Sequence, residues 1–208
     1  MSKYDKVEYT NVETNPLVEG EKELWSGKPN KKAFMINQIV TMAPFAIVWL
    51  AFDSFFIYML VTGFMESGDN MGWLALFLVP FFALHLMPVW IWLSQIITAN
   101  KKWQNTKYYV TDKRIIIKNG FFAENFQTFY YKDIKNVNLS VGLLDKILGV
   151  GDIHLDLSEG GAGILDIDNP MEVYPKIQKI VLDIQTDMEF PNAYRPEENP
   201  GYKTKYKG

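Results

Sequence analysis

Residues 70–100 read NMGWLALFLVPFFALHLMPVWIWLSQIITAN and contain no Asp, Glu, Lys or Arg. Residues 33–65, which precede them, are also apolar, and Asp53 is their single charged residue. A helix needs about 20 apolar residues to cross the hydrocarbon core of a bilayer. Each run is long enough to cross a membrane once, so we predict transmembrane helices at residues 33–65 and 73–99.

Basic residues flank this pair of apolar runs, and acidic residues lie between them. The flanking lysines are Lys28, Lys31 and Lys32 before the first run and Lys101, Lys102 and Lys107 after the second. Residues 66–72, which connect the runs, hold Glu66 and Asp69 but no Lys or Arg. Because cytoplasmic loops carry an excess of Lys and Arg, we predict a two-span protein of the cell membrane. Both termini are expected in the cytoplasm, with residues 66–72 as an external loop.

After the second run the apolar residues recur at every second position, which is typical of strands. The alternating apolar positions are Tyr108 and Val110, Ile115 and Ile117, Val137 and Leu139, Ile153 and Leu155, and Leu165 and Ile167. Asn119-Gly120 favours a tight two-residue hairpin turn. Several short strands at this spacing indicate an antiparallel sheet or barrel.

Near the end of the chain the apolar spacing becomes helical. One apolar face is formed by Val173, Ile177, Ile180, Val181, Ile184 and Met188. The predicted fold is therefore an α+β membrane protein: a two-helix transmembrane hairpin, followed at residues 100–190 by a cytoplasmic antiparallel β-barrel or sandwich that a C-terminal α-helix closes. Residues 1–32 are predicted to be a polar cytoplasmic segment, in which Trp25 either anchors at the membrane interface or packs on the soluble domain. Residues 191–208 are expected to be a disordered tail.

The composition argues against catalysis. The chain has 208 residues, no cysteine and two histidines, which removes thiolate metal sites, Fe–S clusters and cysteine nucleophiles. Residues 149–151 hold two glycines but lead into a predicted strand, whereas a phosphate-binding loop opens a helix. We expect no enzyme activity, catalytic residue, metal site or cofactor, and no nucleic-acid partner. Four polar residues are expected on the solvated outer face of the sheet, and not as cation ligands: His154, Asp156, Asp166 and Asp168.

Five short motifs follow one another between residues 23 and 188. They are Trp25-Ser26-Gly27-Lys28-Pro29, Tyr109–Ile117 with Gly120, Asp133–Val137, Leu148–Ile153, and Asn169-Pro170. With these motifs in this order, the chain resembles the bacterial pleckstrin-homology (PH)-like domain membrane protein family. The resemblance implies a PH-like fold for residues 100–190.

The resemblance implies binding and not catalysis. Domains of this family generally lack the basic phosphoinositide pocket of their eukaryotic relatives, and some small membrane members resemble self-protection factors. We therefore expect a non-catalytic scaffold that presents a PH-like domain at the cytoplasmic face and binds protein or lipid. The alternative is a self-protection (immunity) factor against a membrane-active peptide. The expected partners are the lipid bilayer and either a protein or a second copy of the chain.

Asp53 and His85 are the ionisable residues well inside the predicted spans. Counted from the connecting loop, Asp53 lies about 13 positions in and His85 about 15, so at about 1.5 Å per residue their depths are similar. A carboxylate that faces lipid costs about 2.5–3.5 kcal/mol, so such residues usually turn inward and find a partner. They are candidates for an intramembrane pair. Alternatively, Asp53 lies in a watery or protein-facing position or against a second copy, and His85 is a neutral filler.

Six basic residues form a candidate lipid-facing strip after the second run: Lys101, Lys102, Lys107, Lys113, Arg114 and Lys118. Anionic lipid attracts each Lys or Arg near the surface by about 1 kcal/mol. The alternative is that these residues only orient the helices, and that Arg114 pairs with an acidic residue such as Asp112 or Asp133.

Overall fold

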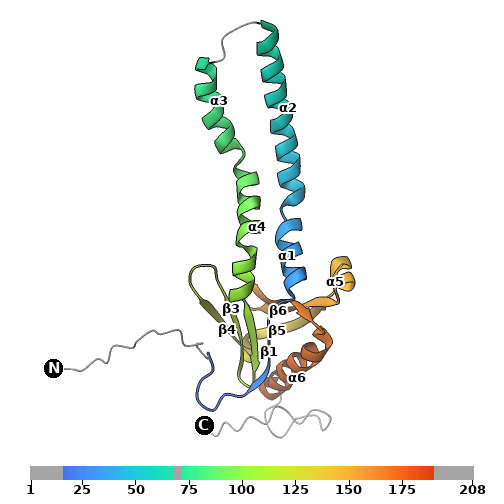
Figure 1. Cartoon of the computed structure of the whole chain (residues 1–208). Coiled ribbons are helices and arrows are strands. Elements are labelled where there is room, and N and C mark those ends of the chain that lie inside the picture. Colours follow the sequence, from blue (N-terminus) through green and yellow to red (C-terminus); the bar gives the residue numbers. More distant parts are fainter. Residues whose placement is uncertain (1–15, 68–71, 190–208) are drawn as a thin grey trace, which may run out of the picture.

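The computed structural model describes residues 16–67 and 72–189. Three sequence-based expectations concern residues outside these ranges: those for residues 1–15, for most of the external loop, and for the tail at 191–208. Figure 1 shows two long helical arms that rise from a compact domain of strands and helices.

Each arm consists of two helices with a break between them. The first arm contains α1 (Lys31–Val40) and α2 (Ala43–Ser67), and the second contains α3 (Gly72–His85) and α4 (Met87–Asn105). The second arm bends by 52° at its break, where Pro88 lacks the N–H that would continue the helix. Among the described residues, the helix Lys31–Glu66 is long and apolar enough to cross a membrane, and the bent second arm adds another if it is one span.

A tryptophan from the opposite arm bonds to a backbone carbonyl at each break. Trp49 Nε1 donates to the carbonyl of His85 at 2.7 Å, and Trp92 Nε1 donates to that of Ile39 at 2.9 Å. Carbonyls at a helix end lack an N–H partner within the helix, and these indoles supply a donor. The two bonds join the arms at the two helix breaks.

The compact domain contains two antiparallel sheets. The first has the order β1 (Glu23–Gly27), β2 (Lys107–Thr111), β3 (Arg114–Asn119), β4 (Asn125–Tyr130), and the second has the order β5 (Ile134–Ser140), β6 (Val150–Leu157), β7 (Gly161–Asp168). Helix α5 (Leu143–Leu148) lies between β5 and β6, and α6 (Pro170–Glu189) follows β7.

The fold is α+β, but the two sheets are not closed into a barrel, which corrects that part of the prediction. In the described ranges no strand of one sheet pairs with a strand of the other. The short 3-10 helix η1 (Tyr131–Asp133) separates β4 from β5. Tyr131 is buried there, and its hydroxyl donates to the carbonyl of Thr111 at 2.6 Å. This fixed corner carries the chain from one sheet to the other.

Strand β1 comes from the residues before the arms and pairs with β2, which follows them. Gly27 lies opposite Tyr108, and Ser26 lies opposite Tyr109. The helical hairpin is therefore inserted between two neighbouring strands of one sheet, and this sheet extends beyond residues 100–190. Trp25 packs partly buried against the core, which is the second of its two expected positions.

Helix α6 packs against β5, β6 and the η1 corner. Its buried face is Val173, Ile177, Ile180 and Val181, as the helical spacing predicts. The core draws side chains from both sheets and from this helix. The arms leave the domain elsewhere, so the core does not depend on side chains from the hairpin (Figure 1).

Candidate binding cleft and charged groups

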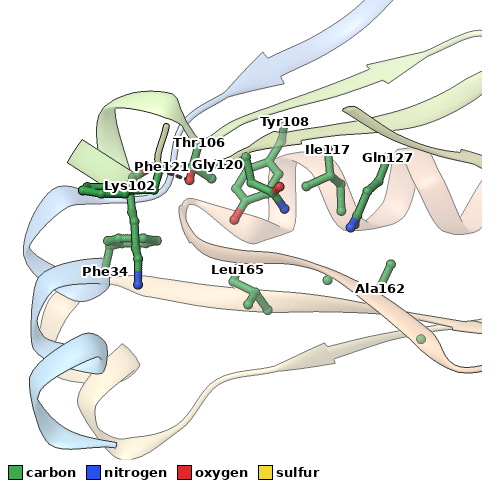
Figure 2. A pocket seen from close by; sticks show the side chains of 13 residues that line it. Phe34, Lys102, Thr106, Tyr108, Ile117, Gly120, Phe121, Gln127, Ala162 and Leu165 are labelled. Atoms are coloured by element: carbon green, nitrogen blue, oxygen red, sulfur yellow. Dashed lines mark hydrogen bonds between the residues drawn. The ribbon is translucent and has the colours of Figure 1, made fainter. Parts of the chain in front are cut away.

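A cleft of about 520 Å³ lies between the sheets at the base of the arms. Figure 2 shows Phe34 and Lys102, from the two arms, at one end of this cleft. Tyr108 and Ile117 line the side formed by the first sheet, and Ala162 and Leu165 line the side formed by β7. The cleft is thus built from both sheets and both arms.

The cleft combines apolar walls with polar side chains, which are Lys102, Thr106, Tyr108, Asn119 and Gln127. Burial, together with the carboxylates of Asp166 and Asp152, raises the pKa of Tyr108 to about 12, so its hydroxyl is uncharged at neutral pH. Lys102 contributes an ammonium group. The described lining contains no Ser, Cys, His, Asp or Glu. These groups suit the binding of an amphipathic molecule or segment, with the lysine positioned for an anionic or carbonyl end.

The connection between β3 and β4 is longer than the two-residue turn that the sequence predicts at Asn119-Gly120. Asn119 is paired with Asn125, so the turn contains the residues between them. Gly120 has φ of +141°, and a Cβ there would clash with the backbone oxygen of Ala123 in the same turn. Asn105, at the end of α4, donates from Nδ2 to the carbonyls of Gly120 and Phe121 at 3.3 and 3.2 Å. The turn is therefore fixed to the second arm.

Two asparagines fix the first arm to β7. Asn37 Nδ2 donates to Asp166 Oδ1 at 2.6 Å, and Asn30 Nδ2 donates to Asp168 Oδ1 at 2.8 Å. The backbone N–H of Asn30 also donates to the carbonyl of Asp166 at 2.6 Å. Asn30 in addition caps α1 through its side chain. Sequence reasoning missed this junction; its one local signal is Asn30 at an N-cap position.

Asp166 does not lie on the solvated outer face of the sheet, which corrects the prediction for that residue. It is 4% exposed and has φ of 56°. The register between β6 and β7 shifts between Gly151 and Ile153, which breaks the inward–outward alternation. His154 and Asp168 are exposed as expected, and Asp156 is half-buried.

Burial, with Asp152 and Asp145 nearby, raises the pKa of Asp166 from 3.8 to about 6. The folded protein therefore holds this proton more tightly than the unfolded chain, and the resulting stability is lost as pH rises through about 6. We expect Asp166→Asn to raise the Tm at pH 7 and to flatten its decline between about pH 4 and 6, measured by thermal unfolding in detergent. Glu159→Gln, at an exposed turn, is the control. If the Tm of Asp166→Asn depends on pH as that of the unaltered chain does, the raised pKa of Asp166 is not the cause of the decline.

Four of the six basic residues of the predicted strip lie near the arms: Lys101, Lys102, Lys107 and Lys118. Lys107 begins β2 directly after α4 and lies opposite Lys118. The Nζ atom of Lys107 lies 4.7 Å from the centre of the Tyr109 ring, and that of Lys118 pairs with the Glu124 carboxylate. These contacts engage Lys107 and Lys118, but the positive charge of all four lysines stays at the base of the hairpin.

Lys113 and Arg114 lie at the other end of the β2–β3 pair, away from the arms. Arg114 Nη2 and Nε each lie 3.0 Å from the carboxylate of Glu21, whose side chain is fully buried. Burial opposes ionisation of Glu21, but hydrogen bonds from Arg114 and Thr111 outweigh it and lower the pKa of that carboxyl to about 2. Arg114 thus has a structural partner, and it is Glu21 and neither of the two acids that the sequence suggested, Asp112 and Asp133.

The structure brings Asp53 and His85 together where the second arm bends. Asp53 Oδ1 lies 2.8 Å from His85 Nδ1, and Asp53 is 1% exposed. The His85 ring stacks on Phe81 with a centroid distance of 5.3 Å. The other carboxylate oxygen, Oδ2 of Asp53, is buried without a hydrogen-bond partner among the described residues. The contact joins the first arm to the second at the point where the second arm bends.

The family model of the bacterial PH domain matches residues 45–181. The chain belongs to this family. The match begins within α2 and ends within α6, so it omits β1, although β1 completes the first sheet of the PH-like domain. Among curated proteins, none matches the chain.

A solved structure from Shewanella loihica PV-4, a DUF1696 family protein with a pleckstrin-homology domain, is similar to part of the chain. The two share 14% sequence identity, and the TM-score is 0.30. The similarity covers 35% of this chain and 67% of the other.

Proposed function

We propose that this chain is a non-catalytic protein of the cell membrane that presents a PH-like binding domain at the cytoplasmic face. In this proposal the arms cross the bilayer as a hairpin, and the cleft at their base receives part of a lipid or of a protein. Membership of the bacterial PH domain family supports a binding or scaffold role. The fold alone does not specify the partner.

The observation that carries the proposal is the apolar surface of the arms. On the second arm, Leu76, Leu84 and Ile97 expose 73%, 75% and 80% of their surface, and on the first arm Val48 exposes 68%. Soluble monomers rarely expose contiguous apolar patches larger than a few hundred Å². Lipid hydrocarbon is as apolar as these side chains, so their exposure to it carries no free-energy cost of hydration. This supports an intramembrane position for both arms.

The base of the arms has the features of a membrane–water boundary. The Nζ atoms of Lys28 and Lys31 lie 5.4 and 5.0 Å from the centre of the Trp103 ring. The Trp103 indole donates to the carbonyl of Pro29 at 2.7 Å. Interfacial tryptophans beside lysines are typical of the cytoplasmic ends of transmembrane helices, which supports the proposed orientation.

Cysteine labelling tests this topology, because the chain has no cysteine of its own. Glu66→Cys places a thiol at the end of α2, and Leu182→Cys places one on the exposed face of α6. A membrane-impermeant maleimide is expected to label Glu66→Cys in intact cells and Leu182→Cys in inverted vesicles. Labelling of both positions from the same side would exclude a two-span hairpin.

The self-protection alternative stays a prediction. It differs from the scaffold in its partner, a membrane-active peptide, and growth of cells that carry or lack the chain in the presence of such a peptide distinguishes the two. Protection that requires the hairpin but not the PH-like domain would favour the alternative and contradict a role for the cleft.

A further inference from the structure

Two apolar tips project from the PH-like domain beside the base of the hairpin. The phenylalanine turn is the connection between β3 and β4, and its Phe122 is 89% exposed. The second tip is α5, on which Leu143 and Ile147 are 84% and 79% exposed. Figure 1 shows these tips on opposite sides of the arms, both at the end of the domain from which the arms rise.

Helix α5 presents its apolar residues away from the core. Leu143 and Ile147 are four positions apart and share one face of the helix. Gly149, with φ of 72°, ends the helix and returns the chain to β6. Helix α5 contacts α1 and β6, so its position is set by the first arm and the second sheet, and its exposed leucine and isoleucine contribute nothing to the core.

The second arm sets the position of the phenylalanine turn, as the first arm helps to set that of α5. Lys101 of α4 places Nζ 5.3 Å from the centre of the Phe121 ring and 5.4 Å from that of Phe122. The two rings pack edge to face with 4.2 Å between their centres. The hydrogen bonds from Asn105 hold the turn against α4. An ammonium group over aromatic rings is a favourable pair, and both groups suit the interfacial layer of a bilayer.

We propose that both tips insert into the interfacial layer of the leaflet that the hairpin crosses, so that lipid is their binding partner. This inference rests on the proposed function, because it requires the arms to be in a bilayer. One tip lies beside α1 and the other beside α4. A bilayer that surrounds the hairpin meets both tips at once, whereas a single protein partner has to reach around the arms.

Insertion would also set the position of the binding cleft. Phe121 and Lys102 line the cleft, and Phe121 belongs to the phenylalanine turn. With the turn in the leaflet, this end of the cleft opens at the level of the lipid headgroups. Lys102 then faces anionic phosphate, to which lysines near the surface are attracted. The bound group would enter from the membrane and not from the cytoplasm.

Spin labels on single cysteines in the full chain test the inference. Labels are placed by Phe122→Cys and Ile147→Cys at the tips, by Leu182→Cys on α6 as the aqueous control, and by Ile57→Cys within α2. The chain is reconstituted in vesicles of phosphatidylcholine and phosphatidylglycerol. The readout is the ratio of collisions with oxygen, which concentrates in lipid, to collisions with a nickel chelate, which stays in water. We expect this ratio at both tips to exceed that at Leu182→Cys at least twofold.

The four labels distinguish failure of this inference from failure of the proposed function. Lipid-like values at Ile57→Cys with water-like values at both tips would overturn the insertion and leave the hairpin in the membrane. Water-like values at Ile57→Cys would overturn both. Tip labels shielded from oxygen and nickel alike would indicate burial against protein or a second copy, which also overturns the inference.

Discussion

Replacing Ile180 with aspartate is expected to unfold the PH-like domain but not the arms, which the proposed topology places in the bilayer. Ile180 is 5% exposed and belongs to the core that α6 forms with the two sheets. Removing such a side chain costs about 2–5 kcal/mol, and an unpaired buried carboxylate adds a cost of its own. Because a domain is stable by only about 5–15 kcal/mol, most of this stability is lost. Limited proteolysis of the reconstituted protein should then digest the domain rapidly.

Leu182→Asp is the matched control for this prediction. Leu182 lies on the same helix, two positions away, and is 55% exposed. Substitutions at exposed sites usually change the stability by less than about 0.5 kcal/mol, so the domain of this variant should resist the protease as the unaltered chain does. Equal resistance of Ile180→Asp would mean that α6 does not cover the core.

His85→Ala is expected to destabilise the hairpin more than Asp53→Asn does. Without the imidazole, Asp53 keeps a buried carboxylate whose Oδ1 has lost its 2.8 Å contact. Leaving a buried acceptor without its hydrogen-bond partner costs about 1–3 kcal/mol. Asparagine at position 53 carries no charge and can still bond to the imidazole, so its cost is smaller. Thermal unfolding of the full chain in detergent measures both effects.

The double variant completes the thermodynamic cycle. We expect Asp53→Asn to recover much of the loss caused by His85→Ala, because it replaces the buried carboxyl group that has lost its partner with an amide. His154→Ala, at the other histidine of the chain, is the control: His154 is exposed on β6, and its loss should leave the Tm unchanged. Additive losses for Asp53→Asn and His85→Ala would show that the contact contributes no coupling energy.

The features that the sequence predicts correctly are those encoded by local patterns. The helical spacing of Val173, Ile177 and Ile180 places the buried face of α6. The alternation of Ile153 and Leu155 with polar residues places the buried face of β6 in the same way. The motifs around residues 109–117 and 148–153 lie within the matched range of the bacterial PH domain family. Asp53 and His85 are brought together because residues counted from one loop lie at comparable heights in two antiparallel helices.

The features that the sequence does not predict depend on contacts between distant residues. Nothing in Glu23–Gly27 specifies pairing with a strand on the far side of the hairpin. The bulge that turns Asp166 inward is visible only once β6 and β7 are paired. The partner of Arg114 lies on the segment before β1, and the cleft needs both sheets and both arms. The separate sheets likewise follow from the η1 corner, which no periodic pattern encodes.

The position of β1 determines when the domain can be completed during synthesis. In the proposed topology, β1 emerges from the ribosome before either arm exists, and β2 emerges only after both. Gly27 can pair with Tyr108 only if the second arm has returned the chain to the side of the membrane on which β1 lies. Contacts between distant residues are otherwise slow to form; in this topology, insertion of both arms would bring the two strands together. A nascent chain that fails to insert its second arm leaves β1 without β2 as its pairing partner, and Trp25 without the core against which it packs.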